Sequence, residues 1–213
     1  HPLFGHREYA FLLTGTLTTL MDNAGLSISV DDPLILRGNI DLQGAGSDLV
    51  VQSDDLVYIE GQFQIGGGIT VCGGVELNNG DCTGDDLGGA SDVAGEIFGQ
   101  SIYLHDTASL ITTEPGGSIK LRAAQEIALL GAVISGGTLG AAGVEWIAPD
   151  STVEITVGGA FELDSAIMAA KSVTVNADSF VVTTIGGITA GGFTSDNSGG
   201  LIDINVAGDL EIM

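Results

Sequence analysis

The chain has 213 residues, of which 28 are acidic and only five are lysine or arginine, so its formal net charge is −23. This charge argues against nucleic acid and anionic membranes as partners, because both would repel the protein. With 34 glycines and few aromatic residues, the composition suits tight turns better than a large globular core. The longest apolar run near the start, residues 9–13, is far shorter than the roughly 18 residues that cross a bilayer.

Residues 1–16 do not follow the pattern of the rest of the chain, and two roles are open for them. Either they cap the first coil of a repeat structure, whose strand edges need cover, or they extend to a neighbouring subunit and add a strand to it. From Leu17 onward, short segments alternate between apolar and polar residues and are separated by turn-forming residues, which is typical of β-strands. Residues 17–213 are therefore predicted to form one elongated β-domain.

The alternation is interrupted at residues 78–99, where a glycine-rich, acidic insertion is predicted. It contains Asp81, Asp85, Asp86 and Asp92, whose carboxylates are the type of ligand that calcium prefers. Neither an EF-hand loop nor the nonapeptide of calcium-binding β-rolls is present. A solvated acidic loop is the favoured interpretation, and a calcium site is the alternative.

Two cysteines, Cys72 and Cys82, flank the start of this insertion. A disulfide between them would close a loop of about 11 residues and stabilise the fold by on the order of 2.5 to 3 kcal/mol on the chain-entropy model. The alternative is a pair of reduced thiols. We favour the disulfide in this acidic, β-rich, lysine-poor chain, and with it an oxidising compartment.

The second half of the chain repeats one short phrase four times. The copies begin at Ser118, Val144, Ser172 and Leu201, which lie 26, 28 and 29 residues apart, and a second alternating run follows each at a fixed distance. A strand of four or five residues cannot bury its apolar face unless successive copies stack, so this period predicts a solenoid. We expect an all-β parallel β-solenoid with irregular coils of about 17–29 residues, the shortest between Ser101 and Ser118.

Equivalent residues of successive coils should lie over one another about 4.8 Å apart and form interior rows. The predicted rows are Leu121, Ile147, Val175 and Ile204 in the first, and Ile127, Val153, Val181 and Leu210 in the second. Glu145 would also point inward, and an unpaired charge is costly to bury. We therefore expect this strand to shift by one residue, which turns Val144 and Trp146 inward.

Candidate catalytic groups are few and dispersed. The adjacent aspartates at 54–55 and at 85–86 are the pairs available for hydrolysis, which needs two carboxylates about 5 to 10 Å apart. Lys120 and Arg122 share one strand face and would suit a substrate carboxylate, although neighbouring cations on an acidic solenoid are more often plain surface charge. Because no set of candidate catalytic residues is predicted to meet at one site, catalysis is not expected.

The repeated phrases, such as those at 117–129 and 171–182, resemble the repeats of filamentous-haemagglutinin-type secreted proteins. The resemblance covers residues 118–213 and, more loosely, 38–121. It implies a right-handed parallel β-helix in a large bacterial surface or secreted protein concerned with adhesion or extracellular fibres. The Asn-Pro-Asn motifs of the family's secretion domain are absent from the sequence, and the coil lengths are less regular than in the family.

These observations together predict an extracellular structural or adhesive β-solenoid. We expect it to be a fragment or subunit of a cell-surface protein or filament, and to associate with copies of itself end to end or by strand addition. No membrane insertion and no cofactor except calcium are expected. Two alternatives are a β-helix that binds or cleaves glycans, including surface glycans, and a calcium-dependent component of a surface layer or matrix.

Overall fold

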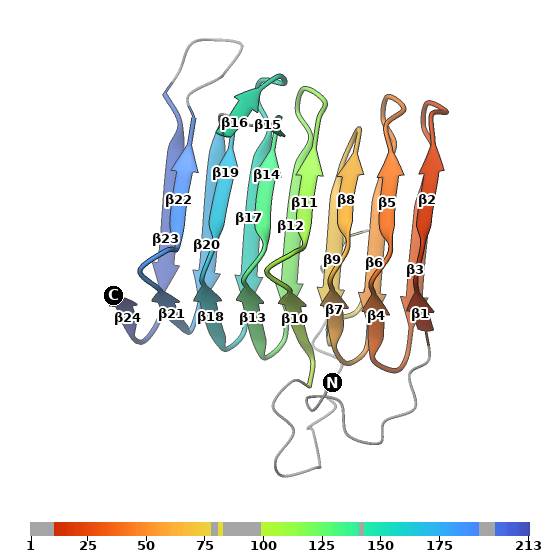
Figure 1. Ribbon diagram of the computed structural model, residues 1–213. Coiled ribbons are helices and arrows are strands. Elements are labelled where there is room, and N and C mark those ends of the chain that lie inside the picture. The colour runs from red at the N-terminus through yellow and green to blue at the C-terminus, as the bar shows by residue number, and fades with distance from the viewer. Residues whose placement is uncertain (1–10, 78–80, 83–98, 141–142, 192–198) are drawn as a thin grey trace.

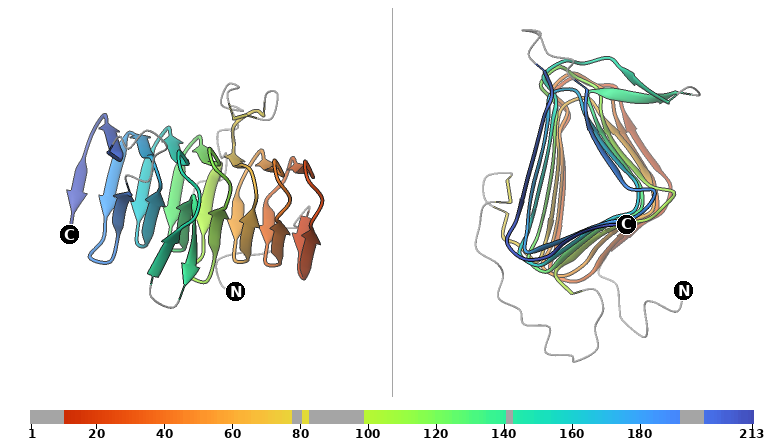
Figure 2. Two further views of the ribbon diagram at one scale, coloured as in Figure 1. Left: turned by 90° about the horizontal axis from the view of Figure 1, so that it is seen from above. Right: turned by 90° about the vertical axis from the view of Figure 1, so that its left-hand side faces the viewer.

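The computed structural model describes residues 11–77, 81–82, 99–140, 143–191 and 199–213. The regular structure of these residues is all β-strand, and all strands but two lie in three long parallel sheets, A, B and C, that enclose a triangular interior (Figures 1 and 2). Each coil adds one strand to sheet A, one to sheet B and one to sheet C, and the chain advances as a right-handed helix (Figure 2). The predicted right-handed parallel β-helix is confirmed.

Sheets A and B form two sides of the triangle, and in each of them strands from successive coils pair in parallel. Sheet A consists of β1 (Phe11–Leu13), β4 (Leu34–Leu36), β7 (Val57–Ile59), β10 (Ser101–Leu104), β13 (Glu126–Leu129), β18 (Ala160–Leu163), β21 (Ser179–Val182) and β24 (Leu210–Ile212). Sheet B consists of β2 (Thr16–Thr19), β5 (Asn39–Leu42), β8 (Gln62–Ile65), β11 (Ser109–Thr112), β14 (Ala132–Ser135), β19 (Ala166–Ala169) and β22 (Gly187–Ala190).

Sheet C forms the third side, and a separate antiparallel hairpin lies at the corner between sheets B and C (Figure 2). Sheet C consists of β3 (Leu26–Val30), β6 (Leu49–Ser53), β9 (Ile69–Gly73), β12 (Ser118–Ala123), β17 (Thr152–Val157), β20 (Ser172–Ala177) and β23 (Leu201–Val206). The hairpin consists of β15 (Gly137–Gly140) and β16 (Gly143–Trp146).

The core is a set of apolar rows that run along the axis of the solenoid. Because side chains alternate between the two faces of a strand, every second residue points inward and meets its equivalent in the next coil. One row of sheet C contains Ile28, Val51, Val71, Leu121, Ile155, Val175 and Ile204. One row of sheet A contains Leu34, Val57, Ile102, Ile127, Phe161, Phe180 and Leu210.

The two predicted rows were therefore wrong in part. In the first row Ile155 occupies the position that we assigned to Ile147, which is exposed. In the second row the positions assigned to Val153 and Val181 belong to Phe161 and Phe180. Val153 lies in sheet C beside Ile119, and Val181 is on the outer face between Glu162 and Glu211.

The source of this error is the hairpin, which includes the predicted copy of the repeat at Val144. Strand β16 pairs antiparallel with β15 and belongs to none of the three sheets. The expected inward turn of Val144 and Trp146 does not occur, because Glu145 is exposed on a ribbon outside the coil and no charge needs to be removed from the interior. Trp146 instead packs against Gly191, which follows β22.

Coil lengths vary more than the sequence predicted. Residues in register are as close as Phe161 and Phe180, 19 positions apart, and as distant as Ile69 and Ile119, 50 positions apart. The longest coil contains the expected insertion at 78–99, of which residues 81, 82 and 99 are described. The predicted 17-residue coil from Ser101 to Ser118 does not exist, because these residues begin strands of different sheets.

The boundary placed at residue 17 also moves. Strand β1 already belongs to sheet A and pairs with β4, and β2 begins at Thr16 and pairs with β5. The described part of the expected N-terminal cap is thus the first coil of the solenoid itself. Residues 1–10, to which the rest of that expectation applies, lie outside the described residues.

Candidate functional site

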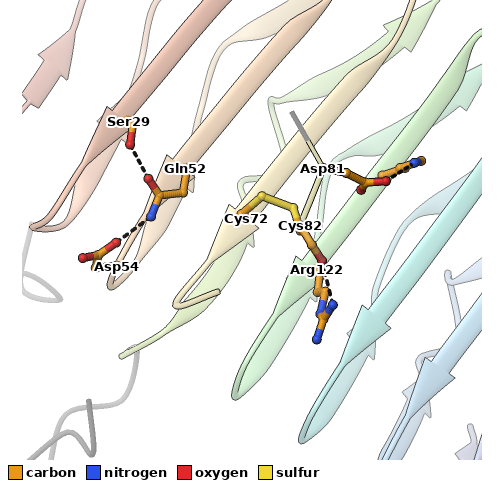
Figure 3. The surroundings of a disulfide bond; sticks show 8 residues. Ser29, Gln52, Asp54, Cys72, Asp81, Cys82 and Arg122 are labelled. Carbon is orange, nitrogen blue, oxygen red and sulfur yellow. Dashed lines mark hydrogen bonds and ion pairs between the residues drawn. A yellow bond between two sulfur atoms is a disulfide. The ribbon is translucent and has the colours of Figure 1, made fainter. Parts of the chain in front are cut away.

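The start of the insertion is attached to the outer face of sheet C. Strand β9 ends at Gly73, and Gly74 reverses the chain with a φ of +68°, a conformation that residues with a side chain rarely adopt. The chain then returns along the outer face, where Cys72, Val75 and Cys82 form a small buried cluster separate from the core (Figure 3). Ala124, which follows β12, packs against this cluster, so the cluster lies near the end of sheet C from which the chain continues to sheet A.

Cys72 and Cys82 form the predicted disulfide, with their Cα atoms 5.7 Å apart. Cys72 occupies an outward position of sheet C, between Gln52 of the preceding coil and Arg122 of the next. Both cysteine side chains are buried. The bond therefore fixes residue 82 against the sheet rather than linking two exposed loops.

Two cations of β12 hold the same segment. Lys120 Nζ lies 2.6 Å from Asp81 Oδ2, and Arg122 Nη1 donates a hydrogen bond of 2.7 Å to the carbonyl oxygen of Cys82 (Figure 3). The two side chains share the outer face of the strand, as predicted from their spacing, but they contact residues 81 and 82 of the same chain. The suggested site for a substrate carboxylate thus has both of its cations engaged in intramolecular contacts.

The calcium hypothesis rested on four aspartates of the insertion. Asp81 is paired with Lys120, an arrangement that already neutralises its carboxylate. Asp85, Asp86 and Asp92 lie outside the described residues. Across the described ranges, no group of three or more histidine, cysteine, aspartate or glutamate side chains is placed to hold a metal ion.

The candidate catalytic pair at 54–55 takes part in a hydrogen-bond network instead. Ser29 donates to Gln52 Oε1, and Gln52 Nε2 donates to Asp54 Oδ1 over 2.5 Å (Figure 3). Asp55 Oδ1 accepts a hydrogen bond of 3.1 Å from the backbone N–H of Gln100, where the chain re-enters the coil. These carboxylates hold side chains and backbone in place. The other pair, at 85–86, lies outside the described residues.

An aromatic pair on the outer face of sheet A was not singled out from the sequence. Tyr58 and Tyr103 are in register in β7 and β10, and their rings stack with centroids 5.3 Å apart. Only 5% of Tyr58 is exposed, and burial, followed by the nearby charge of Glu60, raises its pKa to about 12. The signal was available, because each tyrosine is the outward residue of an alternating strand.

The ionic contacts next to this pair also join residues of the same chain. Arg37 Nε lies 3.0 Å from Glu60 Oε2, and His105 Nδ1 lies 2.7 Å from Asp106 Oδ1. Burial, and secondarily the charge of Glu162, raises the pKa of Glu126 on the same sheet. Glu126 and Glu162 both lie on the outer face of sheet A, because Ile127 and Phe161 take the inward positions of their strands.

Comparison of the chain with protein-family models, with curated proteins and with solved structures gives no match. The described residues include no helix long and apolar enough to cross a membrane. The disulfide is compatible with an extracellular location.

Proposed function

We propose that this protein is an extracellular structural and adhesive β-solenoid, a fragment or subunit of a surface protein or fibre whose copies assemble end to end. The observation that carries the proposal is the exposure of apolar core rows at both ends of the solenoid. Leu17 is 42% exposed at one end, and Ile202 and Ile204 are 45% and 39% exposed at the other. Their equivalents in the inner coils, Ile40, Val173 and Val175, are completely buried.

Stacking of copies would remove this surface from water. Each Å² of apolar surface that is buried contributes roughly 25 cal/mol, and the backbone groups of the outermost strands would gain partners at the same time. The sides of the solenoid offer less for association, because the chain carries a net charge of −23 and like-charged copies repel each other laterally. End-to-end contact is therefore the mode of assembly that the apolar surface favours.

The extracellular assignment is supported by the buried disulfide, which persists in an oxidising environment. A structural role is supported by the outward-facing charged groups described above, because their contacts are with other residues of the same chain. A binding or cleaving role toward glycans has no comparable support in the described residues, since of the two stacked tyrosines Tyr58 is buried and Tyr103 is partly buried.

Negative-stain microscopy and light scattering of the purified chain test the proposal over a range of protein and calcium concentrations. Elongated particles of increasing length are expected as concentration rises. Ile204→Asp, which places a charge in an end row, should shorten them, whereas Gln62→Asp adds the same charge at an exposed mid-solenoid position and should not. Isolated particles of single-chain length under every condition would contradict the proposal.

A further inference from the structure

We infer that the C-terminal edge of sheet C binds the N-terminal edge of sheet C of a second copy of this chain in one defined register. In that register β23 lies parallel to β3 of the next copy, with Ile202 beside Leu26 and Ile204 beside Ile28. This inference rests on the proposed end-to-end assembly and adds which strands meet and how they align.

The interior rows of sheet C continue from one copy to the next in this register. The row that ends at Ile202 begins at Leu26, and the row that ends at Ile204 begins at Ile28. Both ends of both rows are apolar, so each row continues without a change of chemistry when copies stack. A shift by one residue would instead place Asp203 over Leu26 or Ile28, since successive side chains face opposite sides.

The outer face of the same strands supports the same register. At one end Asn205 Nδ2 donates a hydrogen bond of 3.2 Å to Asn176 Oδ1, and at the other Ser29 donates to Gln52. Docking places Asn205 beside Ser29, which joins two short ladders of polar side chains into one. It also places Asp203 beside Ser27, so that no like charges lie directly opposite each other in this sheet.

A hollow of about 530 Å³ opens at the C-terminal edge of sheet C. It is lined by the apolar side chains of Val157, Ala177, Ile204 and Val206 and by the polar side chains of Asn176, Asp178 and Asn205, among others. In the docked register Val30 of the next copy lies beside Val206 and covers the apolar side of the hollow, while Ser29 faces its polar side at Asn205.

The number of strands in sheet A limits how two copies can stack. It includes both β1 and β24 and so has one strand more than sheets B and C. If sheets B and C continue directly, β24 of one copy and β1 of the next claim the same position. Pairing through β2 and β3 aligns strands of four and five residues, against three for β1, so contact through sheets B and C is favoured. Leu210 and Ile212 of β24 are mostly exposed, and β1 of the next copy replaces the backbone pairing with β21 that is lost when β24 is displaced.

Cysteine cross-linking tests the register. The double variant Ser29→Cys/Asn205→Cys places two thiols opposite each other across the contact, and mild oxidation should give a ladder of covalent multimers on a non-reducing gel. In the matched control, Ser29→Cys/Asp203→Cys, the two positions are diagonal neighbours roughly 7–8 Å apart, and multimers should be far fewer. Equal ladders, or a stronger ladder in the control, would overturn the register even if fibres form. Absence of both covalent multimers and elongated particles would instead overturn the proposed function.

The displacement of β24 has its own test in the full-length chain. Glu211→Pro removes a backbone donor from β24 and weakens its pairing with β21, so copies should assemble at a several-fold lower concentration. Glu211→Ala removes the same charge and keeps the backbone donor, and it should assemble like the parent chain. Weaker assembly of the proline variant would show that β24 belongs to the contact, which contradicts docking through sheets B and C.

Discussion

Phe161 and Phe180 occupy the same interior position in successive coils, and their rings stack with centroids 4.6 Å apart and planes inclined by 14°. Both side chains are completely buried or nearly so. They lie in the shortest coil, where 19 residues complete one turn. A stacked aromatic pair thus fills the interior of the solenoid where the coil has the fewest residues to form its corners.

We expect Phe161→Ala to lower the free energy of unfolding by about 3–5 kcal/mol, because it leaves a cavity in the core and removes the partner of Phe180. Phe161→Leu retains most of the volume and should cost less than half as much. Denaturant unfolding followed by circular dichroism measures both values. A loss below about 1 kcal/mol for the alanine variant would mean that the coils repack around the gap.

Glycine at the corner between sheets A and B allows successive coils to approach closely. A Cβ atom at Gly61 would lie 1.8 Å from the carbonyl oxygen of Gly38, where neither backbone can yield. Gly61→Ala should therefore destabilise the protein by at least about 2 kcal/mol. Gly187→Ala is the control, since its Cβ meets open space, and the change should be neutral or stabilising by about 0.4–1 kcal/mol. Thermal unfolding of the two variants decides, and equal midpoints would contradict the steric argument.

The architecture could be predicted because stacked strands need apolar and polar residues to alternate, and this alternation repeats along the sequence. The hairpin could not be recognised by the same signal, since its strand β16 alternates with the same period as a coil strand. The one sign was Glu145, whose charge did not fit an inward position. The second predicted row, in sheet A, was wrong partly because the corner between sheets C and A is one residue shorter in one coil. Leu121 and Ile127 are six residues apart, whereas Val175 and Phe180 are only five apart.

The candidate site was predictable only where partners are close in sequence. Cys72 and Cys82 are separated by 10 positions, and their bond followed from that proximity. The pairing of Lys120 with Asp81 depends on how the insertion folds back over the next coil, 39 positions away in sequence. Local alternation places Lys120 on the outer face but contains no information about what it meets there.

The disulfide should be a measurable part of the stability. Replacing both cysteines by alanine is expected to lower the free energy of unfolding by about 2–3 kcal/mol, since the bond restricts the unfolded chain at the start of the insertion. Denaturant midpoints measured with and without reductant test this. The parent chain should lose stability once unfolding exposes the buried bond to the reductant, whereas the double alanine variant should not respond. Identical midpoints for parent and variant would show that the bond contributes nothing.

The ion pair of Lys120 and Asp81 should contribute little, because each side chain is 38% exposed and water screens the attraction. A double-mutant cycle with Lys120→Met and Asp81→Asn is expected to give a coupling energy of about 0.2–1 kcal/mol that falls as salt is added. Asp81→Asn should leave any effect of calcium on thermal unfolding unchanged. Loss of a calcium-dependent shift in that variant would show that Asp81 is a metal ligand after all.

Alkaline pH should weaken the fold through Tyr58. Burial and then the charge of Glu60 raise its pKa from 10.0 to about 12, so the folded protein retains the phenol proton that the unfolded chain releases. The stability linked to this proton is fully present below pH 10 and is lost as the pH rises toward 12. Denaturant midpoints of Tyr58→Phe should therefore fall less steeply over this interval than those of the parent chain. Part of the slope should remain, since burial raises the pKa of Tyr103 in the same direction. Parallel curves for parent and variant would show that the ionisation of Tyr58 is not coupled to folding.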